Sequence, residues 1–546
     1  MKTAESRNPW LVLLVVCVGS FLILLNSTIV NVAIPTILSS LNAGLDQILW
    51  VVNAYLLTFA VLILVGARLG DLFGQRNVFA TGLAIFSVAA ALSGLAQDAN
   101  ELIATQVLMG VGAALLAPQP LVIVSAVFPA QRRGAAIGIL SAITGLAALA
   151  GPTLGGLIVT NLDWRWVFFV LVPVGVLGLA LAFLLLPDLR PDKRQALDLV
   201  GVGLASAGLF GVVFGLIEGQ RYDWGAVGGS SVTIPEIIGG GLLVLAAFLV
   251  WERFQAAPLM PLSIFRNRNF SIMTWLNGLL FFALFGLLFT TTIDLQSVLG
   301  MSAVQAGLTT IPLTVMLIAV APLAGRLTDL IGSRYILMVG FLLLGAGIAA
   351  VAFAESVTAD SLTFVLPLVL TGLGMGMVIA PVMTEAMREM TPVLAGTASG
   401  ILNTTRQLGS AVGVAIVGAV LQNQLSAAMH DRAVADSAQL PSAARAGFVK
   451  GVDNAARAGL QVGRGQSGGF HLPAGLPPQV AHQMQELIHD VFVNGYATAM
   501  RPTLAVAAAA VLLGALTCIF IVRRPSPAGA IQLESHPLVD TGGARP

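Results

Sequence analysis

The sequence predicts an all-α integral membrane protein with about fourteen transmembrane helices, organised as two six-helix halves and two inserted central helices. Three observations support this prediction. Hydrophobic residues make up 57% of the 546-residue chain and charged residues only 10%, with a mean hydropathy of +0.91, whereas a soluble domain carries about 25% charge. Apolar runs long enough to cross a bilayer recur along the chain. A short polar pattern occurs twice, between matching pairs of these runs.

The predicted spans follow one another with few interruptions. The first run, Trp10–Leu38, is too long for the apolar core of a signal peptide, so we interpret it as a retained helix. We expect an N-terminal half at 1–190, the inserted helices at 191–262, a C-terminal half at 263–524 and a cytoplasmic tail at 525–546. The predicted spans are centred near Leu22, Phe59, Ile85, Ala114, Gly145, Leu171, Leu209, Val244, Leu284, Val315, Leu344, Gly372, Gly409 and Val511.

Lysine and arginine are concentrated in alternate loops between these spans. If the N-terminus lies inside, the inner loops collect most of these residues, and the short outer loops keep only Arg165 and Arg221. The positive-inside rule therefore predicts a multi-pass protein of the cell membrane with both termini cytoplasmic. The bias toward Ala, Gly and Val is compatible with a bacterial source.

Several function classes are disfavoured. A net charge of +1 gives no reason to expect a nucleic-acid partner. Cys17 and Cys518 lie in apolar runs, so neither a disulfide framework nor a metal cluster is expected. We find no GxxxxGK[ST], HExxH or GxSxG motif, so we expect neither an enzyme nor a bound cofactor. Because one chain holds both halves, a monomer is sufficient.

One segment does not fit the membrane. Residues 422–494 are polar and fall on the outer side, so we expect an extracytoplasmic loop there. Within it, residues 477–492 have the pattern of an amphipathic helix that begins with proline. His482 and His489 share a face of that helix, but no third ligand is evident, so a solvated face is favoured over a metal site.

The polar repeat relates the two halves. The spacing of Leu69-x-Asp71-x-x-Gly74-x-Arg76 recurs as Leu327-x-Asp329-x-x-Gly332-x-Arg334. The first copy lies between the second and third spans, and the second copy lies between the tenth and eleventh. Such repeats are typical of secondary transporters, which bind substrate near the membrane midplane between the repeats.

These features resemble the major facilitator superfamily, and in particular its fourteen-helix drug:proton antiporters. The resemblance covers nearly the whole chain and rests on the repeat and on segments in the order expected for that family: "NSTIVNVAIPTI" (26–37), "WRWVFFVLVPVG" (164–175), "GLIEGQRYDWG" (215–225), "LQSVLGMSAVQAGLTTIP" (295–312) and "GILNTTRQLGSAVGVAI" (400–416). The resemblance implies a transporter that exports small lipophilic drugs or antibiotics through the bilayer by alternating access, with protons as the coupling ion.

The resemblance also implies roles for two glycine-rich motifs. The repeat would be a conformational latch, in which Asp71 accepts hydrogen bonds from a neighbouring helix start. Gln75 stands where the family usually has a base. The latch residues are Gly66, Arg68, Gly70, Asp71, Gly74, Arg76, Asp329, Gly332 and Arg334. An antiporter-type motif in the fifth span would shape the seam between the halves through Gly138, Gly151, Pro152, Gly155 and Gly156.

Two charges expected from the resemblance are missing. Asn26 stands where the family usually has an aspartate, and Gln106 where it usually has an arginine. In one interpretation the lost pair was structural, and coupling depends on another carboxylate, with Asp294 and Glu385 as candidates. In the other, coupling is lost and the protein is a facilitator.

The candidate substrate cavity is nearly neutral, which suits lipophilic, weakly charged compounds. Its residues are Asn26, Thr28, Asn31, Asn53, Tyr55, Gln106, Gln119, Asn277, Phe281, Asn403, Arg406 and Gln407. Two alternatives to a drug exporter stay open at this point. One is a dedicated exporter or facilitator of a single endogenous metabolite or lipid, and the other is a membrane sensor on a transporter scaffold.

Overall fold

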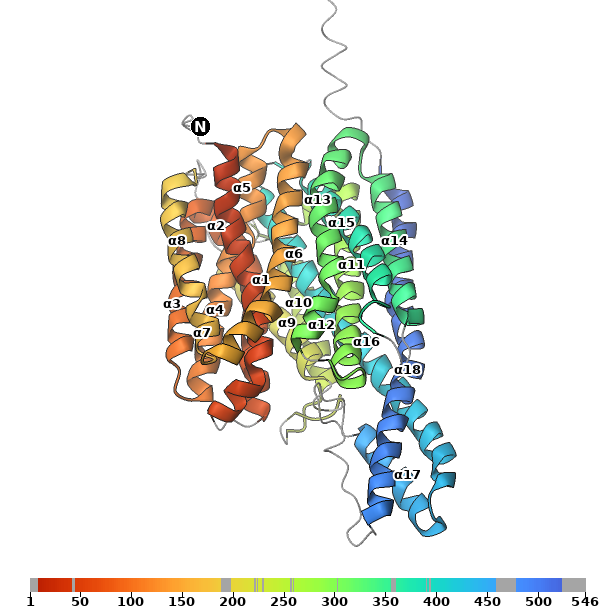
Figure 1. Ribbon diagram of the computed structural model, residues 1–546. Helices are drawn as coiled ribbons and strands as arrows, with labels where there is room; N and C mark the ends of the chain where they lie inside the picture. Colours follow the sequence, from red (N-terminus) through yellow and green to blue (C-terminus); the bar gives the residue numbers. More distant parts are fainter. Residues whose placement is uncertain are drawn as a thin grey trace, which may run out of the picture.

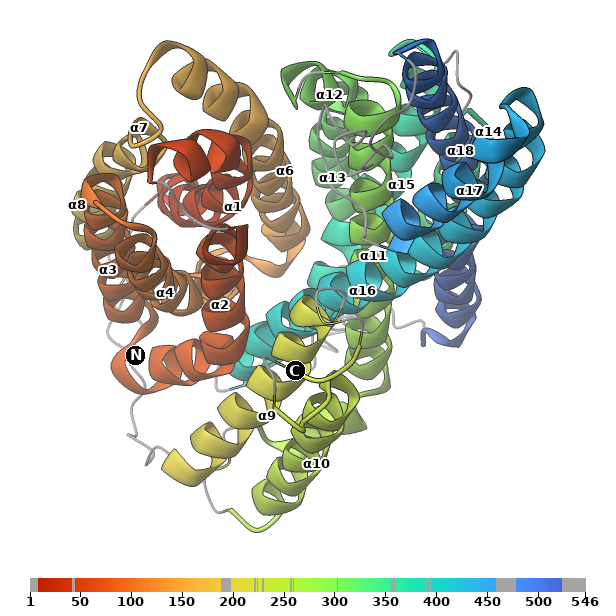
Figure 2. The same ribbon diagram turned by 90° about the horizontal axis from the view of Figure 1, so that it is seen from below.

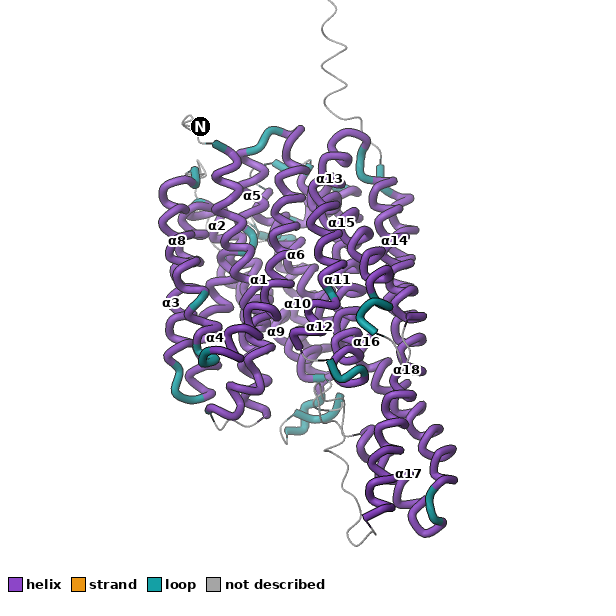
Figure 3. Tube along the Cα trace, in the orientation of Figure 1, coloured by secondary structure: helices purple, strands orange, loops and turns teal. Residues whose placement is uncertain are grey.

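The computed structural model describes residues 8–41, 45–187, 198–219, 222, 224–227, 230–255, 258, 260–301, 303–354, 360–388, 390–391, 394–457 and 478–522. Helices joined by short loops account for nearly all of this part of the chain (Figure 3). The long helices, with the short helices that continue two of them, are α1 (Pro9–Ser40), α2 (Leu45–Phe73), α3 (Gln75–Leu95), α4 (Ala99–Leu116) with α5 (Gln119–Val127), α6 (Ala130–Asn161), α7 (Trp166–Phe169) with α8 (Leu171–Leu185), α9 (Leu199–Glu218), α10 (Ile234–Glu252), α11 (Arg268–Ile293), α13 (Ile311–Ile331), α14 (Arg334–Ala354), α15 (Val365–Met387), α16 (Ala395–Asp436) and α18 (Pro478–Thr517).

Every predicted span coincides with one of these helices or helix pairs. Thirteen stretches of the described residues are long and apolar enough to cross a membrane. The predicted fifth span lies in α6, whose 32 residues also exceed the length needed to cross a bilayer. Large apolar side chains such as Leu184, Leu243 and Phe353 are more than half exposed, as expected where the solvent is lipid. The predicted all-α membrane fold is confirmed.

The two halves are built from the same helix pairings. In the first half, α1 packs on α6, α2 on α4, and α3 on α4 and α8. In the second half, the corresponding helices do the same: α11 packs on α16, α13 on α15, and α14 on α15 and α18. Figure 1 shows the first half in red to yellow beside the second half in green to blue, with α6 and α13 adjacent at the centre.

The inserted helices α9 and α10 form a hairpin. Asp198 caps α9 by accepting a hydrogen bond from the Gly201 backbone N–H, and Thr233 and Glu236 form a capping box at the start of α10. The helix α9 packs on α2 of the first half and on α16 of the second, so the hairpin lies beside the seam between the halves (Figure 2).

The predicted outer loop at 422–494 is largely helical where the structure describes it. The helix α16 has 42 residues, about 63 Å, and therefore extends well beyond a hydrocarbon core of about 30 Å. The expected amphipathic helix at 477–492 is the first part of α18, with no break before the span. Together with α17 (Ser442–Arg457), these extensions form a helical unit at one end of the molecule (Figure 1).

This helical unit buries apolar side chains, which explains why the polar segment folds. Met429 of α16, Phe448 of α17 and Leu487 of α18 are all buried in a cluster continuous with the core of the second half. The side chains of His482 and His489, residues 458–477 and the tail at 525–546 lie outside the described part.

Candidate functional site

Each copy of the polar repeat brings its aspartate to a helix start in the opposite half. Asp329, in the last turn of α13, accepts a hydrogen bond from the backbone N–H of Gly134 near the start of α6, with an N–O distance of 3.1 Å. Asp71, in the last turn of α2, lies against Gly396 near the start of α16, where an added methyl group would overlap the carboxylate. A helix start carries partial positive charge, so both positions favour an anion. We call this end of the bundle the repeat end.

The repeated glycines have a conformational reason. Gly74 and Gly332 follow the ends of α2 and α13, and their φ angles are 88° and 87°. These values lie in the left-handed region, where residues with a side chain are strained. The two chain reversals that carry the aspartates are therefore the same turn built twice.

The other glycines of the first copy allow α2 to approach α4 and α5. A methyl group on Gly66 would overlap the Ala114 carbonyl, and one on Gly70 would overlap the side chain of Gln119. The amide of Gln119 also donates a hydrogen bond to the Gly66 carbonyl at 3.0 Å and is 1% exposed. Gln119, expected in the cavity, is therefore held in a packed contact at the repeat end.

The basic residues of the repeat occupy less uniform positions. Arg68 is buried and its charge acts on Asp71. Arg76 and Arg334 are half-buried, and the guanidinium of Arg334 lies 5.9 Å from the ring centre of Tyr335. The positive charge that acts on Asp71 thus comes from Arg68 of the same helix, α2.

Sequence reasoning missed a further contact between the halves at the repeat end. The fourth span is interrupted between α4 and α5, and the Pro118 carbonyl lies at this interruption. The hydroxyl of Ser399 on α16 donates a hydrogen bond to that carbonyl at 2.7 Å in a buried position. The signal available in the sequence was the pair of prolines, Pro118 and Pro120, in an otherwise apolar span.

The glycine motif of the fifth span faces two neighbours. Added methyl groups on Gly138 would meet backbone atoms of Ala321 and Pro322 on α13, in the opposite half. Gly151 instead lies against Thr28 of α1 within the same half. The helix α6 thus carries small residues both at the seam and at its contact with α1 within the first half. Gly155 and Gly156 are buried, and the side chain of Pro152 lies outside the described part.

The middle of the bundle contains an arginine with an aromatic neighbour. The guanidinium of Arg406 on α16 lies 5.7 Å from the ring centre of Phe281 on α11. It also interacts electrostatically with Tyr55 of α2, in the opposite half. Tyr55 is buried, and its hydroxyl donates a hydrogen bond to the Ile23 carbonyl of α1 at 2.9 Å. Gln407, next to Arg406, is half-buried.

The two amides that replace the expected charges do not bond to one another. Asn26 is 1% exposed, and its Oδ1 atom has no hydrogen-bond partner among the described residues. Gln106 is equally buried, and its amide nitrogen lies 3.6 Å from the sulfur of Met109. The structure therefore brings no neutral amide pair together at this place.

The remaining cavity candidates that the structure describes are engaged in hydrogen bonds, two of them between helices. Asn53 donates to Glu218 of α9 at 3.5 Å, and Asn277 donates to the Leu402 carbonyl of α16 at 2.7 Å. Asn403 and Thr28 bond to carbonyls of their own helices. The side chain of Asn31 lies outside the described part.

Asp294 is a buried acid at a local widening of its helix. It is 4% exposed, and its Oδ2 atom has no hydrogen-bond partner among the described residues. It begins a π-helical turn, η2 (Asp294–Val298), directly after α11. Such turns occur frequently at functional sites. Nearby, the Tyr496 hydroxyl of α18 donates to the Thr290 carbonyl at 2.7 Å, which fixes the helix before the turn.

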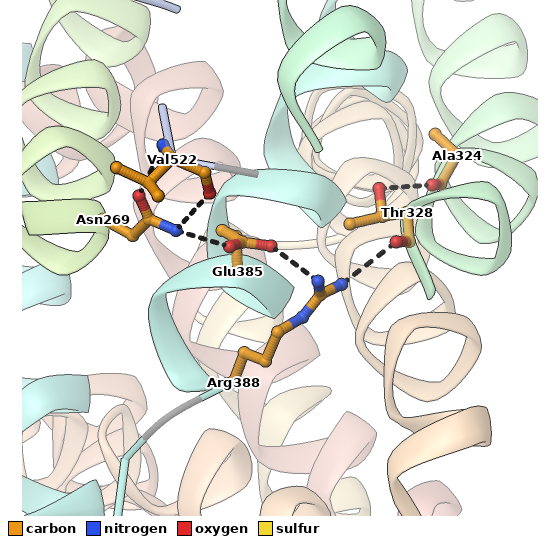
Figure 4. Close-up of polar contacts among 6 residues, drawn as sticks. All are labelled: Asn269, Ala324, Thr328, Glu385, Arg388 and Val522. Atoms are coloured by element: carbon orange, nitrogen blue, oxygen red, sulfur yellow. Dashed lines mark hydrogen bonds and ion pairs between the residues drawn. The ribbon is translucent and has the colours of Figure 1, made fainter. Parts of the chain in front are cut away.

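Glu385 has a different environment, at the repeat end of the second half (Figure 4). Its carboxylate accepts a hydrogen bond from the amide of Asn269 at 3.0 Å and lies 3.3 Å from the guanidinium of Arg388. Arg388 donates in turn to the Thr328 carbonyl at 3.0 Å, and Asn269 exchanges two hydrogen bonds with the backbone of Val522. This network joins α11, α13, α15 and the end of α18, and it supports the segment that carries Asp329.

Comparisons with known proteins agree with this arrangement. The family model described as Major Facilitator Superfamily matches residues 16–414. The tetracenomycin C resistance and export protein of Streptomyces glaucescens is 34% identical over 95% of this chain and 93% of its own length. The multidrug resistance protein Stp of Mycobacterium tuberculosis is 34% identical over 80% of each chain.

Solved structures share the fold at low sequence identity. The proton:xylose symporter XylE matches with a TM-score of 0.54 and 16% identity over 74% of this chain and 86% of its own. The human organic anion transporter MFSD10 matches with a TM-score of 0.58 and 14% identity over 94% of this chain and all of its own. At such identities the likeness shows the fold alone.

Proposed function

Because the chain belongs to the major facilitator superfamily, a family of membrane transporters and not of enzymes, we propose that it exports lipophilic drugs or antibiotics across the cell membrane by alternating access, coupled to proton entry. The export and multidrug resistance functions named for its relatives support the substrate class. The observation that carries the mechanism is the crossed pair of contacts, in which Asp71 and Asp329 each meet a helix start of the opposite half.

In this proposal the repeat end is cytoplasmic, and its contacts form the latch that holds the outward-open state. Separation of the halves at this end would break the Asp329–Gly134 hydrogen bond, the Asp71 contact and the Ser399–Pro118 hydrogen bond together. The glycines of α6 allow its backbone to lie directly against the backbone of α13, and this close contact closes the seam between the halves. Substrate bound around Arg406 would then be released to the outer side.

Asp294 is the preferred proton carrier. Burial of a carboxyl with one oxygen that has no hydrogen-bond partner among the described residues favours its protonated, neutral form. A π-helical turn can change the geometry of this group when the helices move. Glu385 is less suitable, because Arg388 and Asn269 already compensate its charge. The neutral residues Asn26 and Gln106 favour the second candidate function, a facilitator without proton coupling.

The test uses the purified protein in proteoliposomes with a pH-sensitive dye inside and lipophilic antibiotics added outside. We expect proton movement that requires the antibiotic and is abolished in Asp294→Asn. Asp360→Asn, which changes an exposed acid outside the spans, is the matched control and should behave as the unchanged protein. Glu385→Gln should retain coupling.

Each other outcome identifies which part fails. Proton movement that survives Asp294→Asn and disappears in Glu385→Gln would move the proton site to Glu385. Antibiotic movement without proton movement would establish the facilitator. No movement of any compound would contradict export itself.

A further inference from the structure

The middle of α16 is only partly covered by neighbouring side chains. Arg406 lies eleven residues after the start of α16, about 16 Å along its axis, which is near the middle of a hydrocarbon core of about 30 Å. Residues 404–412 are all partly exposed, whereas residues 395–403 before them are all buried. Within this run Gly409 packs against the Gly278 backbone of α11, so α16 contacts α11 on one side and is incompletely covered on its other sides.

The charge of Arg406 has no described counter-charge. Among the described residues, its guanidinium makes no ion pair or hydrogen bond; it lies over the ring of Phe281 and interacts electrostatically with Tyr55. Glu218, an acid at the end of α9, is itself buried and accepts a hydrogen bond from Asn53. A cation within a membrane protein normally has a partner, because removing it from water without one is unfavourable.

Among the described residues, the facing half offers amides and no acid at the corresponding level. Asn26 and Gln106 are fully buried and neutral, and the Oδ1 atom of Asn26 has no donor. A cationic substrate in this place would meet an arginine and find no carboxylate. An anionic head group would instead supply the missing charge and receive paired hydrogen bonds from the guanidinium, which is shaped to bind two oxygens at once.

We propose that this site selects lipophilic organic anions, meaning an apolar or aromatic body that carries a carboxylate or phenolate. The acid group lies on Arg406, and the apolar body packs on Phe281, which contacts Phe285 at a ring-centre distance of 6.3 Å. This inference rests on the proposed export function and names the charge of its substrates.

The test compares three fluorescent probes that differ only in their head group: 1-pyrenebutyrate, 1-pyrenebutanol and 1-pyrenebutylamine. Binding to the purified protein in lipid nanodiscs is measured by energy transfer from tryptophan to pyrene, with empty nanodiscs subtracted to remove partitioning into lipid. We expect the butyrate to bind at least about tenfold more tightly than the butylamine, the range given by one charge-assisted contact.

Variants separate the arginine from general packing. Arg406→Gln should weaken butyrate binding about tenfold or more while butanol binding stays unchanged, which also reports that the variant is folded. Arg406→Lys should keep most of the preference for the anion. Phe281→Ala should weaken all three probes alike. Arg432→Gln, an exposed arginine on the outer part of the same helix, is the matched control and should change nothing.

Equal or tighter binding of the butylamine by the unchanged protein would overturn the proposal without any variant. Retention of butyrate binding by Arg406→Gln would overturn it as well. Transport of the three probes in proteoliposomes distinguishes failure of the export function from failure of the anion selectivity. Export of the butylamine but not of the butyrate would leave the exporter intact and remove its anion selectivity, whereas failure to move any probe or antibiotic would count against the exporter.

Discussion

Removing the charge of Asp329 should open the repeat end. The Asp329 carboxylate is half-buried and accepts the Gly134 backbone N–H at 3.1 Å, near the start of the 32-residue α6. Asparagine keeps an oxygen at this place but loses the charge. A carboxylate at a helix start contributes about 0.3–1 kcal/mol when exposed and up to about 2 kcal/mol when partly buried. Taking about 1–2 kcal/mol for Asp329→Asn, the ratio of open to closed protein rises about 5- to 30-fold.

The opening can be measured as a distance across the repeat end. Spin labels on Phe73→Cys of the first half and Leu330→Cys of the second occupy side chains that are 56% and 75% exposed, while the native cysteines are buried. Double electron–electron resonance should show a longer distance component that grows in Asp329→Asn and not in Asp360→Asn. An unchanged distance distribution, or the same growth in both variants, would refute the assignment of Asp329 as a latch residue.

Three further outcomes are expected. Gly138→Ala should lower antibiotic export at equal expression, because its methyl group would meet backbone atoms of α13. Gly203→Ala, which has open space around it, should not lower export. Equal export by both variants would contradict the role of close α6–α13 packing. Ser399→Ala should destabilise the closed repeat end by about 1–3 kcal/mol in the same distance measurement, because a buried carbonyl loses its donor. Glu385→Ala should lower the Tm of the purified protein, because Arg388 loses its partner, and an unchanged Tm would mean that the network contributes little.

The sequence was sufficient to predict the spans and the relation between the halves, for a physical reason. A helix that crosses lipid must form its backbone hydrogen bonds internally and present apolar side chains. Each span is therefore visible as a local run of apolar residues. The turn glycines, Gly74 and Gly332, were likewise visible in the repeat, because a left-handed residue constrains its own position. Of the helical unit formed by α17 and the extensions of α16 and α18, only the amphipathic helix at 477–492 was predicted, and the rest was expected to be a loop because the partners of its apolar residues are distant in the chain.

Contacts between helices that are distant in the chain could not be predicted in this way. Gln119 has the polarity of a cavity residue, but its amide is used between α2 and α5. Nothing in the sequence around Ser399 indicates its hydrogen bond, because its partner, the Pro118 carbonyl, lies far away in the chain. The environments that distinguish Asp294 from Glu385 also depend on partners from other helices, which no local pattern records.

The position of each polar contact relative to the seam determines its part in the transport cycle. The Glu385 network joins only helices of the second half and the end of α18, so it moves as one body with that half. The Asp329 and Asp71 contacts cross the seam in opposite directions, because α13 meets α6 where α2 meets α16. A rotation of one half against the other must therefore break both contacts together. The free energy needed to open the repeat end then includes a contribution from each contact. In the proposed cycle, the two copies of the repeat would therefore act together as one latch.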